Sequence, residues 1–165
     1  MKTKKILVII FMIFAVTINV LIVVESCIGG AGSESQSLGF TKMIVNITKA
    51  IFPNAEFVKD EEHLHAVVRK LVGHFLLFGL SGIFTTLTLL TNLLSLEKKK
   101  LLIYSGISLG FGLILASISE FIQYFVPGRA GMLTDILIDF GGYLLFTAIV
   151  FVVFLLISNK KEKEQ

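Results

Sequence analysis

The sequence has little cysteine and little charge. Its single cysteine, Cys27, has no second thiol to pair with in this chain, which excludes an internal disulfide framework. Charged residues make up 16% of the 165 residues, whereas about 25% is typical of a soluble domain. The net charge of +3 is small and dispersed, so the composition does not point to a nucleic-acid partner.

Apolar residues are abundant instead, at 55% of the chain, and they form long runs separated by charged stretches. A helix of about 20 residues crosses a hydrocarbon layer about 30 Å thick, and a backbone in lipid must satisfy its own hydrogen bonds. The predicted fold is therefore all-α, an integral membrane four-helix bundle with short amphipathic helices in its outer segment. The four predicted spans are Ile6–Val24, Leu71–Leu96, Leu101–Phe125 and Met132–Ile157.

Lysine clusters flank these spans and predict their orientation. The clusters are Lys2, Lys4 and Lys5; Lys98, Lys99 and Lys100; and Lys160, Lys161 and Lys163. Basic residues favour the cytoplasmic side, so both termini are expected in the cytoplasm. The chain then divides into a first transmembrane helix (1–25), an extracytoplasmic segment (26–70), a three-helix region (71–157) and a cytoplasmic tail (158–165).

The outer segment combines a Gly/Ser-rich stretch with helical patterns. GGAGSESQS, residues 29–37, is typical of a flexible connection. Apolar residues then recur at helical spacing and predict a short amphipathic helix that ends before Pro53. Those residues are Phe40, Met43, Ile44, Ile47 and Ile51. Asp60 is a candidate cap for a further helix, continuous with the second span.

Cys27 allows two interpretations of the first span. A basic start, an apolar run and a cysteine together fit a lipoprotein signal that is cleaved and acylated at Cys27. Glu25 fits poorly with the small residues that a signal peptidase requires, and the apolar run is long enough to span. The sequence favours a retained helix and leaves the other interpretation open.

Polar residues gather at the predicted outer ends of the spans, where charge needs a partner or water. Glu120 and Gln123 share one face of the third span, as do Asp135 and Asp139 on the fourth. His74 lies one turn inside the second span. The candidate ligand-binding residues are Arg69, Lys70, His74, Glu120, Gln123, Arg129, Asp135 and Asp139.

These residues predict either a pocket open to the outer surface or a structural lock. In the lock, Arg129 would pair with Glu120 or Asp135 and fix the hairpin between the last two spans. Glycines on the third span are expected to permit close helix packing. They are Gly106, Gly110 and Gly112.

Two blocks resemble the VanZ-like membrane proteins. RKLVGHFLLFGLSG (residues 69–82) is similar to the family's Arg-Lys…His-Phe stretch. EFIQYFVPGRAGMLTDILIDFGG (residues 120–142) resembles its Glu-x-x-Gln-x-Phe-x-Pro-Gly-Arg block and the following Asp-x-x-x-Asn-x-x-Gly, with Asp139 in place of the usual asparagine. The resemblance implies a bacterial cytoplasmic-membrane protein linked to teicoplanin-type glycopeptide resistance, and it marks the same eight candidate residues.

Three functions stay open. The first is binding of a membrane lipid, a cell-wall precursor or an amphiphilic glycopeptide at the outer leaflet. The second is an enzyme acting on a lipid-linked envelope substrate, with His74, Glu120 and Asp135 as candidate catalytic residues. The third is a transporter or a structural subunit of a membrane complex. No His-Glu-x-x-His motif or Ser or Cys nucleophile motif occurs, so the sequence assigns no metal ligands and no cofactor, and it does not fix the oligomeric state.

Overall fold

Long helices dominate the computed structural model, which describes residues 2–53, 60–93 and 97–163 and contains no strand in that part of the chain. Within those residues, four helices are long and apolar enough to cross a membrane, which confirms the predicted all-α membrane fold. They are α1 (Lys2–Cys27), a continuous helix (Glu62–Asn92), α5 (Lys98–Tyr124) and α6 (Leu133–Lys163).

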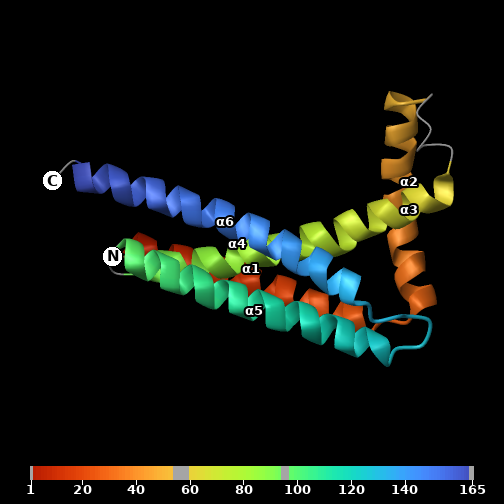
Figure 1. The fold of residues 1–165 in the computed structure, drawn as a ribbon, viewed down its shortest axis with the longest axis horizontal. Coiled ribbons are helices and arrows are strands. Elements are labelled where there is room, and N and C mark those ends of the chain that lie inside the picture. The colour runs from red at the N-terminus through yellow and green to blue at the C-terminus, as the bar shows by residue number, and fades with distance from the viewer. Residues whose placement is uncertain (1, 54–59, 94–96, 164–165) are drawn as a thin grey trace.

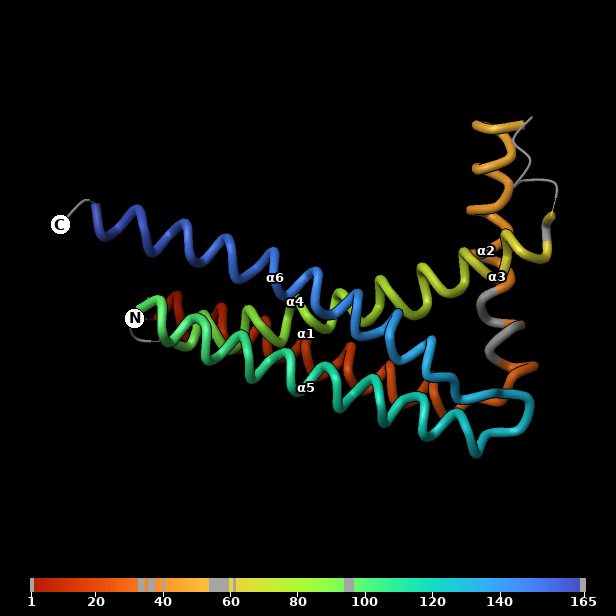
Figure 2. The backbone as a smooth tube through the Cα atoms, in the orientation of Figure 1, coloured from red at the N-terminus to blue at the C-terminus, as the bar shows by residue number. Residues whose placement is uncertain are grey.

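The second of these spans combines three helical segments without a break. It starts as α3 (Glu61–Arg69), widens into a π-helical stretch, η2 (Lys70–Leu76), and continues as α4 (Leu77–Asn92), as the unbroken tube in Figure 2 shows. Asp60 caps α3 by accepting a hydrogen bond from the His63 backbone N–H at 3.0 Å, as predicted. The helix therefore begins well before the apolar run that predicted it, while Leu94–Leu96 at its predicted end lie outside the described residues.

The start of α1 and the end of α6 lie at one end of the bundle, and α2 (Gly30–Ile51) crosses the other (Figure 1). All three lysine clusters lie at the first end. There Lys98 Nζ lies 2.9 Å from Glu162 Oε2, and Lys4 Nζ donates to the carbonyl oxygen of Leu93. This arrangement is what a positive-inside topology requires, although sidedness itself stays a prediction.

The predicted flexible stretch at residues 29–37 is wrong, because the backbone is helical from Gly30 onward. Gly30 N–H donates to the Pro127 carbonyl at 3.1 Å, and a Cβ on Gly30 would lie 2.0 Å from Gly128 O. The start of α2 is thus anchored on the turn between α5 and α6, where Gly128 has a φ of +74°. Tertiary contact overrides local propensity here.

The remainder of α2 follows the prediction more closely. The helix ends at Ile51, before Pro53, and Val45 packs on α3 through Leu64 and Val68. The side chain of Phe40, part of the predicted apolar pattern, lies outside the described residues.

Close approach of η2 and α4 to α6 depends on glycine. A Cβ on Gly142 would lie 2.1 Å from the backbone oxygen of Phe75, and one on Gly82 would lie 2.7 Å from that of Tyr143. Small residues allow such contact between membrane helices. The prediction of close packing is confirmed for Gly112, which faces the Tyr143 ring. It is wrong for Gly106 and Gly110, where an added Cβ would meet no atom of a neighbouring segment within 4 Å.

A hydroxyl network occupies the middle of the bundle. Thr86 on α4 bonds with Ser108 on α5 at 2.8 Å and with Thr147 on α6 at 3.2 Å, and Ser108 also bonds with the Tyr143 hydroxyl at 3.0 Å. All four side chains are buried. Apolar side chains cover the outward faces of the same helices. The interior is therefore more polar than the surface, as expected of a bundle surrounded by lipid.

Candidate functional site

Two side-chain pairs connect the second span to α6 at the end of the bundle opposite the lysine clusters. Lys70 Nζ lies 2.5 Å from Asp135 Oδ1, and His74 Nδ1 lies 3.0 Å from Asp139 Oδ1. In both pairs the partners are 65 residues apart. Lys70 and His74 are four residues apart, and so are Asp135 and Asp139. This spacing places the two basic side chains on one face of the second span and the two carboxylates on one face of α6. The two faces therefore run parallel and in register.

The π-helical stretch η2 carries both basic members of these pairs. A π-helical turn is wider than an α-helical one, and such turns are found often at functional sites. Lys70 begins this stretch and His74 lies near its end. The local backbone therefore departs from a regular helix where the polar residues face α6.

Glu120 brings α5 to the same place. Its Oε1 lies 3.9 Å from His74 Nδ1 and accepts a hydrogen bond from Gln123 Nε2 at 2.9 Å. Its Oε2 accepts from the Met132 backbone N–H at 3.0 Å, just before α6 begins. Glu120 is 2% exposed and Asp139 is fully buried. Three helices therefore bring His74, Glu120 and Asp139 together, with both carboxylates buried and His74 partly exposed.

Arg129 joins this group through Gln123. Its guanidinium donates to Gln123 Oε1 from Nε at 3.1 Å and from Nη2 at 2.6 Å. Gln123 in turn donates to Glu120, so the amide links arginine and carboxylate. Burial, followed by the neighbouring Arg69, lowers the pKa of the Arg129 guanidinium, but an arginine side chain stays charged in proteins. Asp135, the other carboxylate considered for Arg129, forms its ion pair with Lys70.

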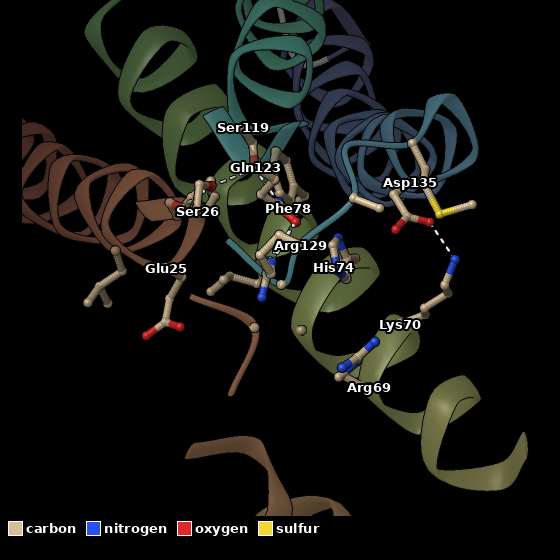
Figure 3. Close-up of a pocket in the computed structure, with 18 of the residues that line it drawn as sticks. Glu25, Ser26, Arg69, Lys70, His74, Phe78, Ser119, Gln123, Arg129 and Asp135 are labelled. Atoms are coloured by element: carbon tan, nitrogen blue, oxygen red, sulfur yellow. Dashed lines mark hydrogen bonds and ion pairs between the residues drawn. The ribbon is translucent and has the colours of Figure 1, made fainter. Parts of the chain in front are cut away.

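A cavity of about 760 Å³ opens beside this group (Figure 3). Figure 3 shows Lys70 directed at Asp135 and Arg129 directed at Gln123. One part of the cavity wall is polar and another is apolar. The polar part includes Glu25, Ser26, Arg69, Lys70, His74, Ser119, Gln123, Arg129 and Asp135; the apolar part includes Leu21, Ile22, Leu77 and Phe78.

The structure thus brings all eight predicted site residues to one end of the bundle. Glu120 and Asp139 do not line the cavity but contact His74, which does. The other six line it, with Arg69 exposed. Their roles in binding or catalysis stay predictions.

Sequence reasoning missed Ser26, which lies at the outer end of the first span. Ser26 donates to the Ile22 carbonyl at 2.7 Å and bonds with Ser119 Oγ on α5 at 2.7 Å, and both serines are buried. Serine is too common in membrane helices to indicate a site. Only the position of Ser26 beside Glu25, at the outer end of its span, could have suggested it.

Comparison with known proteins gives a family match over nearly the whole chain. A family model described as VanZ/LLP1 matches residues 6–156, which include all four spans' apolar cores and both sequence blocks. No curated protein and no solved structure matches the chain.

Proposed function

Because the chain belongs to the VanZ/LLP1 family and its described residues include four helices able to span a membrane, we propose that it binds an anionic amphiphile at the outer leaflet. The ligand is a lipid, a lipid-linked cell-wall precursor or an amphiphilic glycopeptide. The observation that carries this proposal is the cavity, because it combines cationic side chains with an apolar wall.

The two parts of the wall suit the two parts of such a ligand. A guanidinium donates paired hydrogen bonds to phosphate or carboxylate oxygens, so Arg69 and Arg129 are the expected contacts for the head group. Lys70 adds positive charge but is held by Asp135. Leu21 and Phe78 offer surface for an apolar chain.

Binding can be measured on purified protein by native mass spectrometry and thermal shift. The probes are a polyprenyl phosphate and phosphatidic acid, with phosphatidylcholine as the zwitterionic control. Arg69→Ala is expected to weaken phosphate binding about tenfold or more, because a hydrogen bond to a charged group contributes about 1.5–3 kcal/mol. Arg69 is exposed, so this variant should fold.

The matched control is Lys98→Ala, which removes an exposed cation at the opposite end of the bundle. Its binding should equal that of the unmodified protein. Equal affinity for phosphatidic acid and phosphatidylcholine, or an unchanged affinity in Arg69→Ala, would contradict the proposed head-group site.

The proposed sidedness has a convenient probe in Cys27, which is exposed and lies at the cavity end. A membrane-impermeant maleimide is expected to label it in intact cells. Lys161→Cys in a Cys27→Ser background should react only after permeabilisation. The reverse pattern would place the cavity in the cytoplasm. A Cys27 thiol blocked by acylation would instead indicate the lipoprotein interpretation.

Reduced susceptibility to teicoplanin is the proposed consequence in cells if the ligand is the glycopeptide or its target. Expression in a susceptible bacterium should raise the inhibitory concentration, and Arg69→Ala at equal protein level should not. An unchanged inhibitory concentration would contradict a role in resistance, but it would not contradict lipid binding.

A membrane-embedded enzyme is the second candidate, favoured by the position of His74. Its ring lines the cavity while Nδ1 bonds with Asp139, an arrangement that can orient a general acid or base. Product formation from a polyprenyl phosphate ester should then be lost in His74→Ala and Glu120→Gln. Normal turnover in both variants would exclude this role.

A further inference from the structure

Three potential metal ligands converge in the bundle from three different segments. His74 comes from η2, Glu120 from α5 and Asp139 from α6, and one ligand atom from each lies within 4.8 Å of the others. His74 Nδ1 is 3.0 Å from Asp139 Oδ1 and 3.9 Å from Glu120 Oε1. The imidazole therefore lies between two carboxylates.

One atom of this cluster is buried without a hydrogen-bond donor. Within residues 2–53, 60–93 and 97–163, Asp139 Oδ2 has no partner, and the residue is fully buried. The other three carboxylate oxygens of the cluster each accept a hydrogen bond or contact His74. An unsatisfied buried carboxylate oxygen is costly, and its presence calls for a ligand that the protein itself does not provide.

The negative charge of the cluster also favours a bound cation. Two carboxylates lie inside a helical bundle with at most one positive charge from His74 directly between them. The nearest lysine, Lys70, is engaged by Asp135. Carboxylates in a membrane interior require compensation, and a divalent cation would neutralise both of them at once.

We propose that His74, Glu120 and Asp139 form a binding site for a divalent transition-metal ion, Zn²⁺ or Mn²⁺. Ligand atoms bind such ions at about 2.0–2.2 Å, so neighbouring ligands lie about 3–3.5 Å apart. The observed separations need only small side-chain movements to reach this. One imidazole with two carboxylates is a donor set that both ions accept.

The cluster has the supports that metal sites usually have. Gln123 donates to Glu120 Oε1 and the Met132 N–H donates to Oε2, and Gly142 lets α6 approach the backbone next to His74. Three protein ligands leave a coordination position open. Since His74 lines the cavity, that position is adjacent to the space proposed for an anionic ligand. The metal site rests on its own observations and does not depend on lipid binding.

Metal titration of the full chain in detergent, after treatment with EDTA, tests the proposal. ZnCl₂ and MnCl₂ are added separately in competition with a chromogenic chelator. About one ion per chain is expected to bind. Asp139→Asn keeps the shape of the side chain and should weaken binding by more than the ~10–100-fold that supporting residues typically contribute.

Asp135→Asn is the matched control. It removes a carboxylate one turn away on the same helix, paired with Lys70 rather than with His74. Its metal affinity should fall much less than that of Asp139→Asn, since Asp135 provides no ligand and acts on His74 only through its charge. Equal weakening in both variants would indicate a general charge effect, and no binding by the unmodified chain would leave only a hydrogen-bonded His–carboxylate network. Either result overturns the proposal.

X-ray absorption at the zinc edge identifies the ligands of the bound ion in the unmodified protein, so it tests the proposed site even if the variants fail to fold. The unmodified protein should show nitrogen and oxygen ligands with one imidazole. A sulfur ligand would place the ion at Cys27 and contradict the site. Phosphate-lipid binding measured on the EDTA-treated protein separates this result from the head-group proposal, because either can fail alone.

Discussion

Two buried polar regions of the bundle differ in the side chains that form them. The middle holds neutral hydroxyls, Thr86, Ser108 and Thr147, which bond with one another across three helices. The cavity end holds ionisable groups, among them His74 and Asp139. Hydroxyls both donate and accept, so they can satisfy each other. Ionised carboxylates only accept, so they depend on a cation or a bound ligand. The first region is suited to packing and the second to binding.

The largest loss of stability is expected from a substitution at Gly142, which lies between the two polar regions. Gly142→Ala places a Cβ where the Phe75 backbone oxygen lies 2.1 Å away, so α6 must move from η2. The expected loss is about 1–3 kcal/mol, typical of overpacking, and metal affinity should fall with it. Thermal unfolding in detergent measures the loss. Gly106→Ala, which meets open space, is the control. An unchanged midpoint for Gly142→Ala would contradict the close contact.

Removal of an ion pair at the cavity end should lower the free energy of unfolding more than removal of a hydroxyl hydrogen bond in the middle of the bundle. Lys70→Met leaves Asp135, which is 8% exposed, without its cation. We expect a loss of about 1–3 kcal/mol, reduced by the partial exposure of Lys70. The double variant Lys70→Met/Asp135→Asn should recover part of it. Additive losses in this double-mutant cycle would show that the two side chains do not interact.

The hydroxyl network should contribute modestly to stability and nothing to binding. Thr86→Val preserves shape and removes bonds to Ser108 and Thr147. Hydrogen bonds between membrane helices contribute about 0.6–2 kcal/mol, so a loss in that range is expected, with phosphate and metal affinity unchanged. A large change in either affinity would contradict the separation of the two regions.

The smallest effect is expected at the lysine end. Lys98 and Glu162 form an exposed pair at 2.9 Å, and such pairs contribute less than about 1 kcal/mol. Lys98→Gln should shift the thermal midpoint little, and high salt should remove what difference there is. A loss as large as that of Lys70→Met would mean that the two ends do not differ as proposed.

Hydropathy predicted the four spans because lipid imposes a minimum length on any crossing helix. The candidate site was also predictable, since charge inside a membrane helix is rare enough to be informative. Single-sequence patterns do not predict partners: Lys70 rather than Arg129 pairs with Asp135, and Arg129 reaches Glu120 through Gln123. These pairings depend on the relative positions of whole helices.

Other features carry no distinctive signal in the sequence. Serine and threonine are ordinary in membrane helices, so the network around Thr86 could not be recognised. Local propensity opposes a helix at the start of α2. The helix there depends on a backbone contact between Gly30 and the turn at Pro127. Glycine frequency likewise did not distinguish Gly112, which packs against Tyr143, from Gly110, which does not.

The partners in the Lys70–Asp135 pair and in the His74–Asp139 pair are the same number of residues apart, and this limits how α6 can move against η2. Sliding α6 by one turn past η2 would put Asp139 opposite Lys70 and Tyr143 opposite His74, leaving Asp135 without its ion pair. Intermediate positions match neither pair. The two helices therefore have one favoured axial position, and any ligand that needs a different spacing must tilt or separate them rather than shift one along the other.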